Sequence, residues 1–179
     1  MSAAFGAGVV TVLVAGVGNI FLGDDGFGVE VVRRLSTVEL PEFVRVVDYG
    51  VRGMHLAYDL AGAAPELTVI VDATARGDPP GTIHVIDLAL PSTMDNASLL
   101  DAHGMQPDVV LGLVRLLGAD PGRVLLVGCE PAELAERMSL SQAIEQAVDT
   151  AVRVVIELIA QYPFASDEEL TCALASLGK

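Results

Sequence analysis

The sequence is short of aromatic residues, and this shortage limits the kind of core that it can build. Aromatic residues make up 4% of the 179 residues and tryptophan is absent, whereas hydrophobic residues make up 52%. A core of this composition must come from Val, Leu, Ile and Ala, which is typical of a parallel sheet covered by helices on both faces. A chain of this length can bury a substantial core in one piece, so we expect a single α/β domain over residues 1–179.

Basic residues are also scarce. The sequence has 10 Lys and Arg against 24 Asp and Glu, which gives a formal net charge of −14 at pH 7. Such a charge repels the phosphates of nucleic acids and the headgroups of an anionic membrane, so we expect neither as a partner. The same charge permits a basic protein partner or a metal cation.

Cysteines and long apolar segments are few. Cys129 and Cys172 cannot make a disulfide framework and form no Cys-x-x-Cys pair, which favours a reducing compartment. The apolar stretch 3–18 is shorter than the about 20 residues of a membrane span, and no basic residue precedes Arg33 as a signal peptide would require. We therefore expect a cytoplasmic protein without membrane insertion, in which residues 1–8 form a loose N-terminal arm.

Several motifs of known chemistry are missing as well. The sequence has no Gly-x-Ser-x-Gly elbow of the serine hydrolases and no His-x-x-x-His pair of the zincins. The glycine-rich stretch 16–28 also fails two phosphate-binding patterns. Phe21 replaces the third glycine of a dinucleotide-binding turn, and Asp24-Asp25 replace the lysine and hydroxyl of a P-loop. Because two carboxylates repel a polyphosphate, this turn suits a cation.

The sequence does contain an alternation of strand-like and helix-like segments. Apolar runs predict strands at 9–15, 43–48, 67–71 and 123–129. Some alternation of apolar and polar residues predicts an edge strand at 82–88, whose antiparallel direction is left open. Helices are predicted at 29–35, at 54–61 with Gly62 as the stop, at 108–117, at 131–137, and from the capping-box spacing of 139–142 to about Tyr162. A tail with a short helix is predicted within 163–179. Together these elements predict a twisted, mostly parallel sheet of four or five strands with helices on both faces.

Three candidate site residues follow strands or lie in the long irregular segment 89–105. Asp25 is in the turn after the first strand, Asp72 ends the third strand, and His103 lies near the end of the irregular segment. Ligands of open α/β sheets bind at the carboxyl edge of the strands. Each residue also has a plain structural interpretation, because Asp25 could cap a helix, Asp72 could form a turn and His103 could be solvated.

Taken together, two carboxylates and one imidazole leave open coordination positions, as suits a borderline divalent cation. The other histidines are interpreted differently. His55 lies within a predicted helix and His84 within a predicted strand, so both are assigned to packing or to the surface. The residues alone therefore support a metal-binding hypothesis on Asp25, Asp72 and His103.

Several short motifs occur in order between about residue 11 and residue 158, which is nearly the whole chain. They are Gly16-Val17-Gly18-Asn19, Leu22-x-Asp24-Asp25-Gly26-x-Gly28-Val29, Asp48-x-Gly50-x-x-Gly53-Met54, Val71-Asp72-Ala73, the loop His103, and Leu126-Val127-Gly128-Cys129-Glu130-Pro131. As a set they closely resemble the hydrogenase maturation endopeptidases, which process the large subunit of nickel–iron hydrogenases.

The resemblance implies a three-layer α/β sandwich around a twisted sheet of five strands. It also implies an endopeptidase that removes a C-terminal extension from the hydrogenase large-subunit precursor after nickel has been inserted. The residues matching the family's catalytic and metal-contacting positions are Asp25, Asp72 and His103. Relatives can have Glu at the position of Asp25, so the carboxylate here is one methylene shorter.

The resemblance further implies that nickel arrives with the precursor, that no organic cofactor is used, and that the precursor is the partner of a monomeric enzyme. Asp24 is expected to cap the helix or orient Asp25, and Asp48 to line the crevice. Two alternatives are carried beside this interpretation. One is a non-catalytic metal-binding chaperone that docks on the precursor, and the other is a peptidase of similar fold that is unrelated to hydrogenase.

Overall fold

The computed structural model describes residues 11–88 and 107–162, which form strands and helices in alternation. The strands are β1 (Val12–Val17), β2 (Val44–Gly50), β3 (Leu67–Ala73), β4 (Ile83–Asp87) and β5 (Arg123–Cys129). The helices are the 3-10 helix η1 (Gly23–Gly26) and the α-helices α1 (Phe27–Leu35), α2 (Gly53–Ala63), α4 (Pro107–Leu116) and α5 (Gln142–Ala160). The strands lie in one sheet in the order β2-β1-β3-β5-β4.

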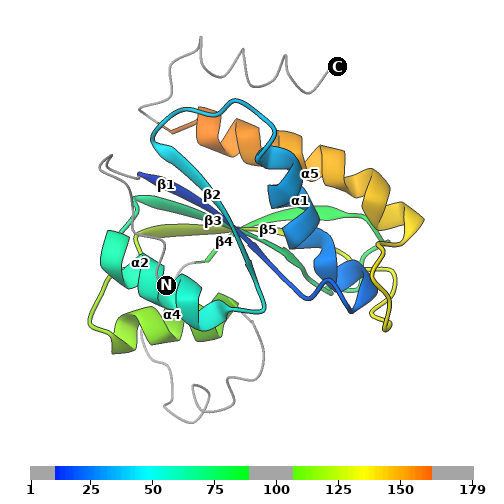
Figure 1. The fold of residues 1–179 in the computed structure, drawn as a ribbon, viewed down its shortest axis with the longest axis horizontal. Coiled ribbons are helices and arrows are strands. Elements are labelled where there is room, and N and C mark those ends of the chain that lie inside the picture. Colours follow the sequence, from blue (N-terminus) through cyan, green and yellow to red (C-terminus); the bar gives the residue numbers. More distant parts are fainter. Residues whose placement is uncertain (1–10, 89–106, 163–179) are drawn as a thin grey trace.

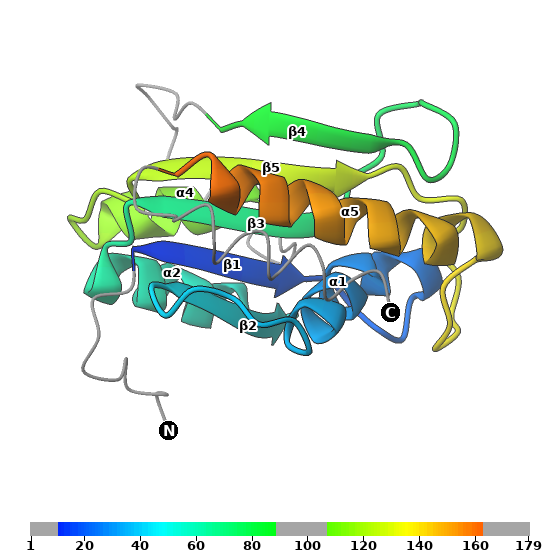
Figure 2. The ribbon, with the colours of Figure 1, turned by 90° about the horizontal axis from the view of Figure 1, so that it is seen from above.

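The sheet is the middle layer of three (Figures 1 and 2). Helices α1 and α5 cover one face, and α2 and α4 cover the other. The side chains of successive β1 residues point alternately to the two faces of the sheet. Val12 and Val14 pack into the core beneath α1 and α5, whereas Leu13 and Ala15 pack into the core beneath α2 and α4. A strand buried on both faces must be mostly apolar, which is why the central strands β1, β3 and β5 are nearly continuous apolar runs in the sequence. The predicted three-layer α/β sandwich is confirmed.

Strand directions agree with the predicted mostly parallel sheet. β1 pairs in parallel with β2 and β3, and β3 pairs in parallel with β5. β4 is the antiparallel edge strand, and it lies against β5. Within the described residues β1 begins at Val12, opposite Val44 and Leu67, and continues to Val17, two residues beyond the predicted end.

The predicted helix at 131–137 is wrong. This segment forms bends and an isolated bridge between Arg137 and Leu22, because its backbone groups bond to the chain after β1 instead of to one another. The Gly23 amide donates to the Arg137 carbonyl (2.8 Å), and the Arg137 amide donates to the Phe21 carbonyl (3.1 Å). A hydrogen-bonding partner distant in sequence has replaced the local helical bonds, and periodicity cannot reveal such a partner.

Two predicted helix ends are also wrong. Gly62 lies inside α2, which ends at Ala63 and is capped by Ala64 in the left-handed conformation (φ 44°). The predicted capping box at 139–142 does not form, because Ser141 is the N-cap of α5 and makes no side-chain cap bond. The Ser141 hydroxyl donates instead to a carboxylate from another part of the chain, that of Asp24 (2.9 Å).

The predicted arm at 1–8 and the predicted tail helix within 163–179 lie outside the described residues. Across residues 11–88 and 107–162, none of the helices combines the length and the apolar character needed to cross a bilayer.

Replacing Gly28 by alanine should destabilise the fold severely. A Cβ at Gly28 would lie 2.1 Å from the carbonyl oxygen of Val71 and 2.3 Å from that of Val17, and neither backbone can yield without moving a strand. We expect Gly28→Ala to lower the free energy of unfolding by about 3 kcal/mol or more, as measured by urea denaturation. Gly62→Ala is the matched control, because a Cβ at Gly62 meets nothing within 4 Å and should stabilise α2 by roughly 0.5–1 kcal/mol. Equal effects of the two substitutions would contradict this packing constraint.

Candidate active site

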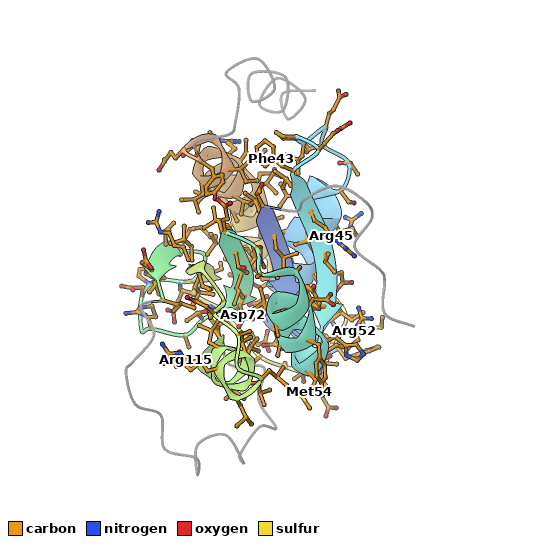
Figure 3. The ribbon with its side chains drawn as sticks, turned by 90° about the vertical axis from the view of Figure 1, so that its left-hand side faces the viewer. Phe43, Arg45, Arg52, Met54, Asp72 and Arg115 are labelled. Carbon is orange, nitrogen blue, oxygen red and sulfur yellow. The ribbon has the colours of Figure 1, made fainter. Side chains whose placement is uncertain are left out.

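The candidate site lies at the carboxyl ends of β1 and β3, which are neighbours in the sheet. Asp72 is the penultimate residue of β3, and it lies on the side of the sheet that α2 and α4 cover (Figure 3). Asp25 lies in η1, between β1 and α1. Both side chains are half-buried, so they are shielded from water but still accessible.

Gly18 allows the two aspartates to approach each other. Its φ of +129° suits glycine, and a Cβ there would lie 1.9 Å from the Asp25 carbonyl oxygen and 3.8 Å from Asp72 Oδ1. The Gly18 amide also donates to the Gly50 carbonyl (3.0 Å), which ties this loop to the end of β2. The loop after β1 is therefore held directly against the end of β3.

The Asp25 carboxylate is held from one side. Its Oδ2 accepts a hydrogen bond from the Asn19 amide (2.7 Å), and Asn19 Oδ1 in turn accepts one from the Phe21 amide (3.0 Å). These bonds close the loop into a turn and fix the direction of the Asp25 side chain. Among the described residues no donor reaches Asp25 Oδ1, so this oxygen is available for a ligand.

Asp72 is the titratable group of the site that the protein perturbs most. Burial, followed by the negative charge of Asp25, raises the pKa of Asp72 to about 8, against a smaller opposing effect of the hydrogen bond from the Ala73 amide. A carboxyl group in this state keeps a proton near neutral pH, because no positive group from residues 11–88 or 107–162 compensates its charge. A divalent cation placed between Asp25 and Asp72 would supply that compensation and displace the proton.

Asp24 plays a different part from its neighbour. Its side chain is fully buried, and its carboxylate accepts hydrogen bonds from the amides of Ala132 (2.9 Å), Glu133 (2.9 Å) and Ser141 (2.6 Å) and from the Ser141 hydroxyl. Burial raises the pKa of Asp24, but the bonds from Ser141 and Glu133 outweigh it, so the pKa lies below its ordinary value. Asp24 anchors the segment between β5 and α5, and its expected role as a cap for the following helix is wrong.

A pocket of about 440 Å³ opens beside Asp72. It is bounded by the loop after β3, by β4 and β5, and by the start of α4, and its lining includes Asp72, Thr74, Arg76, Ile86, Pro107 and Leu126. Pro107 is four residues after His103 in the chain. The pocket thus connects Asp72 with the point at which the described chain resumes after residue 106.

The structure describes some of the predicted site residues and not others. Asp25 and Asp72 are brought together as expected, and His103 lies outside the described residues. Asp48, the weaker candidate, is exposed near the end of β2, and its backbone carbonyl accepts a hydrogen bond from Arg52 Nη2 (2.6 Å).

Sequence reasoning missed a second group of possible ligands, which consists of Asp78, His84 and Glu130. Within the described part of the chain, these three residues form a cluster of two carboxylates and one histidine. The predicted set of Asp25, Asp72 and His103 is a different one, and its histidine lies outside the described residues. The amide of Arg76, together with that of Gly77, holds the pKa of Glu130 below its usual range against the effect of burial. An antiparallel pairing of 82–88 with β5 places His84 close to Glu130, which follows β5. The sequence left the direction of the strand at 82–88 open, so it did not predict this neighbourhood.

Replacing Asp24 by asparagine should loosen the anchored segment. The amide nitrogen of asparagine cannot accept the hydrogen bonds that now reach Asp24, so buried donors would lose their partner. We expect Asp24→Asn to lower the free energy of unfolding by roughly 2–3 kcal/mol near neutral pH, as measured by urea denaturation. The wild-type advantage should fade on acidification, because a lowered pKa gives stability that is lost as the carboxylate takes up a proton.

Asp25→Asn is the matched control for Asp24→Asn, because it makes the same chemical change one residue away at a half-buried side chain. We expect it to change stability by less than about 0.5 kcal/mol. An equal loss of stability in both variants would contradict the division of roles between the two aspartates.

Replacing Asp72 by asparagine should stabilise the protein, and more so at alkaline pH. The unfolded carboxyl ionises near 3.8 and the folded one only near about 8, so the wild type loses stability as the pH rises through this interval. Asparagine does not ionise. We expect Asp72→Asn to exceed the wild type by roughly 0.5–2 kcal/mol at about pH 9 and by less at about pH 6, as measured by urea denaturation. A difference that does not grow with pH would show that Asp72 is not held protonated.

Comparison with known proteins assigns this fold and site to a family. A family model described as hydrogenase maturation protease matches residues 29–158. The hydrogenase expression/formation protein HupD of Rhodobacter capsulatus is 36% identical over 149 residues, which cover 79% of this chain and 70% of the relative. The hydrogenase 2 maturation protease of Escherichia coli is 32% identical over 148 residues, which cover 81% of this chain and 88% of the relative.

The fold has solved counterparts as well. The structure of the hydrogenase maturating endopeptidase HybD from Escherichia coli superimposes with a TM-score of 0.68 at 29% identity, and the match covers 84% of this chain and 92% of that one. The similarity thus extends over most of both chains in sequence and in fold. This chain belongs to the hydrogenase maturation protease family and is an endopeptidase.

Proposed function

We propose that this endopeptidase removes the C-terminal extension of a nickel–iron hydrogenase large-subunit precursor, and that it recognises the nickel already bound to that precursor. Asp25, Asp72 and His103 are the residues that we assign to nickel contact. The observation that carries the proposal is the approach of Asp25 to Asp72 at the edge of the sheet, with no cation of the described chain to compensate Asp72.

The electrostatics of the pair favour a cation over other ligands. Two carboxylates in a half-buried site repel each other, and the cost appears in the pKa of Asp72. A divalent ion relieves that repulsion, whereas a phosphate or an acidic peptide would increase it. Carboxylate and imidazole donors together suit borderline ions such as nickel.

We include His103 in the proposed site because of its position in the sequence and the family resemblance. Pro107, which follows it by four residues, lines the same pocket as Asp72. A neutral imidazole is the most common side-chain ligand of transition metals in proteins. The family resemblance assigns the histidine of this loop to the metal site, and we retain that assignment as part of the proposal.

The chemistry that we assign to the residues is simple. Nickel is cargo of the precursor, and a bound divalent ion can polarise a carbonyl or lower the pKa of a bound water to about 7. Asp72 holds its proton until a cation approaches, and Asp25 is oriented by the Asn19 amide to meet the same ion. Cleavage would then depend on a loaded precursor, because the scissile bond is positioned only when the nickel is held.

Exposed apolar side chains flank this site and suit docking of a large protein substrate. On one side Phe21 is 59% exposed and Met138 is 72% exposed, and the Arg137 amide joins their two segments. On the other side Val51 and Met54 are exposed just after β2, and Figure 3 shows Met54 on the outer side of α2. We assign these exposed side chains to contact with the precursor.

A cytoplasmic location and a monomeric state complete the proposal. The buried, unpaired Cys129 is consistent with a reducing compartment. Size-exclusion chromatography with light scattering tests the monomer directly.

A processing assay tests the proposed function. The purified full chain is incubated with a large-subunit precursor, either loaded with nickel or free of it, and intact mass is measured over time. We expect loss of the C-terminal extension only in the loaded sample. Equal cleavage of the nickel-free precursor would overturn nickel recognition, and no cleavage of either sample would favour a chaperone that docks without cutting.

Substitutions of the three proposed site residues test their roles in the same processing assay. Asp25→Asn, Asp72→Asn and His103→Ala should each slow processing by at least about 100-fold, since even the outer partners of a metal ligand contribute 10–100-fold. Asp87→Asn is the matched control, because Asp87 is an exposed carboxylate that pairs with Leu125 of β5, near the opposite end of the strands from the site. Normal processing by a site variant would remove that residue from the site.

A further inference from the structure

Asp78, His84 and Glu130 form a compact cluster on the β4–β5 side of the sheet. Their ligand atoms all lie within 4.8 Å of one another, and His84 Nε2 is 3.2 Å from Asp78 Oδ2. The three residues come from the loop after β3, from β4, and from the position directly after β5. They are therefore brought together by the tertiary fold.

The antiparallel pairing of β4 with β5 places two of the three side chains. His84 is opposite Gly128, and beyond the paired strands the Glu130 amide donates to the Thr82 carbonyl (2.9 Å) while the Gly81 amide donates to the Glu130 carbonyl (2.9 Å). Glu130 thus continues the ladder beside the start of β4.

The loop after β3 wraps around the Glu130 carboxylate. Its two oxygens accept hydrogen bonds from the amides of Arg76 (2.6 Å) and Gly77 (3.2 Å), and the Thr74 amide donates to the Cys129 carbonyl (2.8 Å). These bonds return the loop to the edge of the sheet and bring Asp78 against His84. Glu130 itself is only 6% exposed, so its position is fixed.

His84 Nε2 is the observation that indicates a ligand. This nitrogen is closed off from solvent, and among the described residues it has no hydrogen-bond partner. A carboxylate oxygen of Asp78 lies 3.2 Å from it, in a geometry that makes no hydrogen bond. A buried imidazole nitrogen without a partner is unfavourable, and a metal ion is a partner that this nitrogen, Asp78 and Glu130 can share.

We propose that Asp78, His84 and Glu130 form a second divalent-cation site, which takes a borderline ion such as Zn²⁺ in preference to Mg²⁺ or Ca²⁺. One imidazole and two carboxylates match the donors that zinc accepts, and the half-exposed Asp78 leaves room for water as a fourth ligand.

This site is separate from the Asp25–Asp72 pair. Asp72, Gly128 and His84 are in register across three neighbouring strands, so Asp72 and His84 are two strand spacings, roughly 10 Å, apart and cannot share an ion. The bound ion would fix the loop that carries Thr74 and Arg76, which line the pocket beside Asp72. Its role is therefore to stabilise one wall of the active-site pocket.

Zinc binding by the full chain in the absence of any precursor tests the proposal. After removal of metal by a chelator, the affinity and stoichiometry for Zn²⁺ are measured by calorimetry and by metal analysis after gel filtration. The variants are His84→Gln, Asp78→Asn, and the double variant Asp25→Asn/Asp72→Asn. His55→Gln is the matched control, because His55 is exposed on α2.

We expect the wild type, His55→Gln and the double variant to bind one zinc ion at this site, and His84→Gln and Asp78→Asn to bind it at least about tenfold more weakly. Cobalt(II) loaded in place of zinc should give a visible spectrum that changes in His84→Gln and is unchanged in the double variant. If His84→Gln fails to fold, the zinc affinity of Asp78→Asn tests the proposal instead. Asp78 lies on an exposed loop, so its substitution should leave the fold intact.

Unchanged zinc binding in both His84→Gln and Asp78→Asn would overturn the proposal. A wild-type chain that binds no zinc would overturn it as well, and His84 and Asp78 would then form only an ion pair. Neither result bears on precursor processing, which is measured separately. Failure of the proposed function would likewise leave this site untouched.

Discussion

The close approach of the β1–α1 segment to the end of β3 is the constraint on which the rest of the structure depends. Gly16, Gly18 and Gly28 make it possible, because a Cβ at any of them would lie within 2.5 Å of a backbone carbonyl oxygen. The approach packs α1 against β1 and β3, which builds one of the two cores. It also carries Asp25 to Asp72, so the same contacts that stabilise the fold assemble the site.

Two adjacent aspartates divide the work of stability and function. Asp24 is buried and fully hydrogen-bonded, and it holds the segment between β5 and α5 against the loop after β1. Asp25 is half-buried, with one oxygen bonded and the other without a donor among the described residues. Its partner Asp72 receives no compensating charge from the part of the chain that the structure describes, which destabilises the fold near neutral pH. The protein retains this unfavourable pair where an approaching cation would relieve it.

The prediction from sequence succeeded where local pattern and burial agree. Apolar runs placed the central strands β1, β3 and β5, since strands buried on both faces must be apolar along nearly their whole length, and partial alternation placed the edge strand β4. It failed where a distant partner replaces the local one. The segment 131–137 bonds to the chain after β1, and Ser141 turns its hydroxyl to Asp24 instead of capping α5. Gly62 remains helical because helix α2 finds its left-handed cap two residues later, at Ala64.

The sequence by itself determined the α/β class, the mostly parallel sheet, the candidate residues Asp25 and Asp72, and the family, because each is written in apolar periodicity or in a short contiguous motif. Only the tertiary structure decided which of the two neighbouring aspartates is structural, how strongly Asp72 is perturbed, and that His84 meets Asp78 and Glu130. These properties depend on burial and on contacts between residues as many as 117 positions apart, such as that of Asp24 with Ser141. Neither burial nor such a contact leaves a local pattern in the sequence.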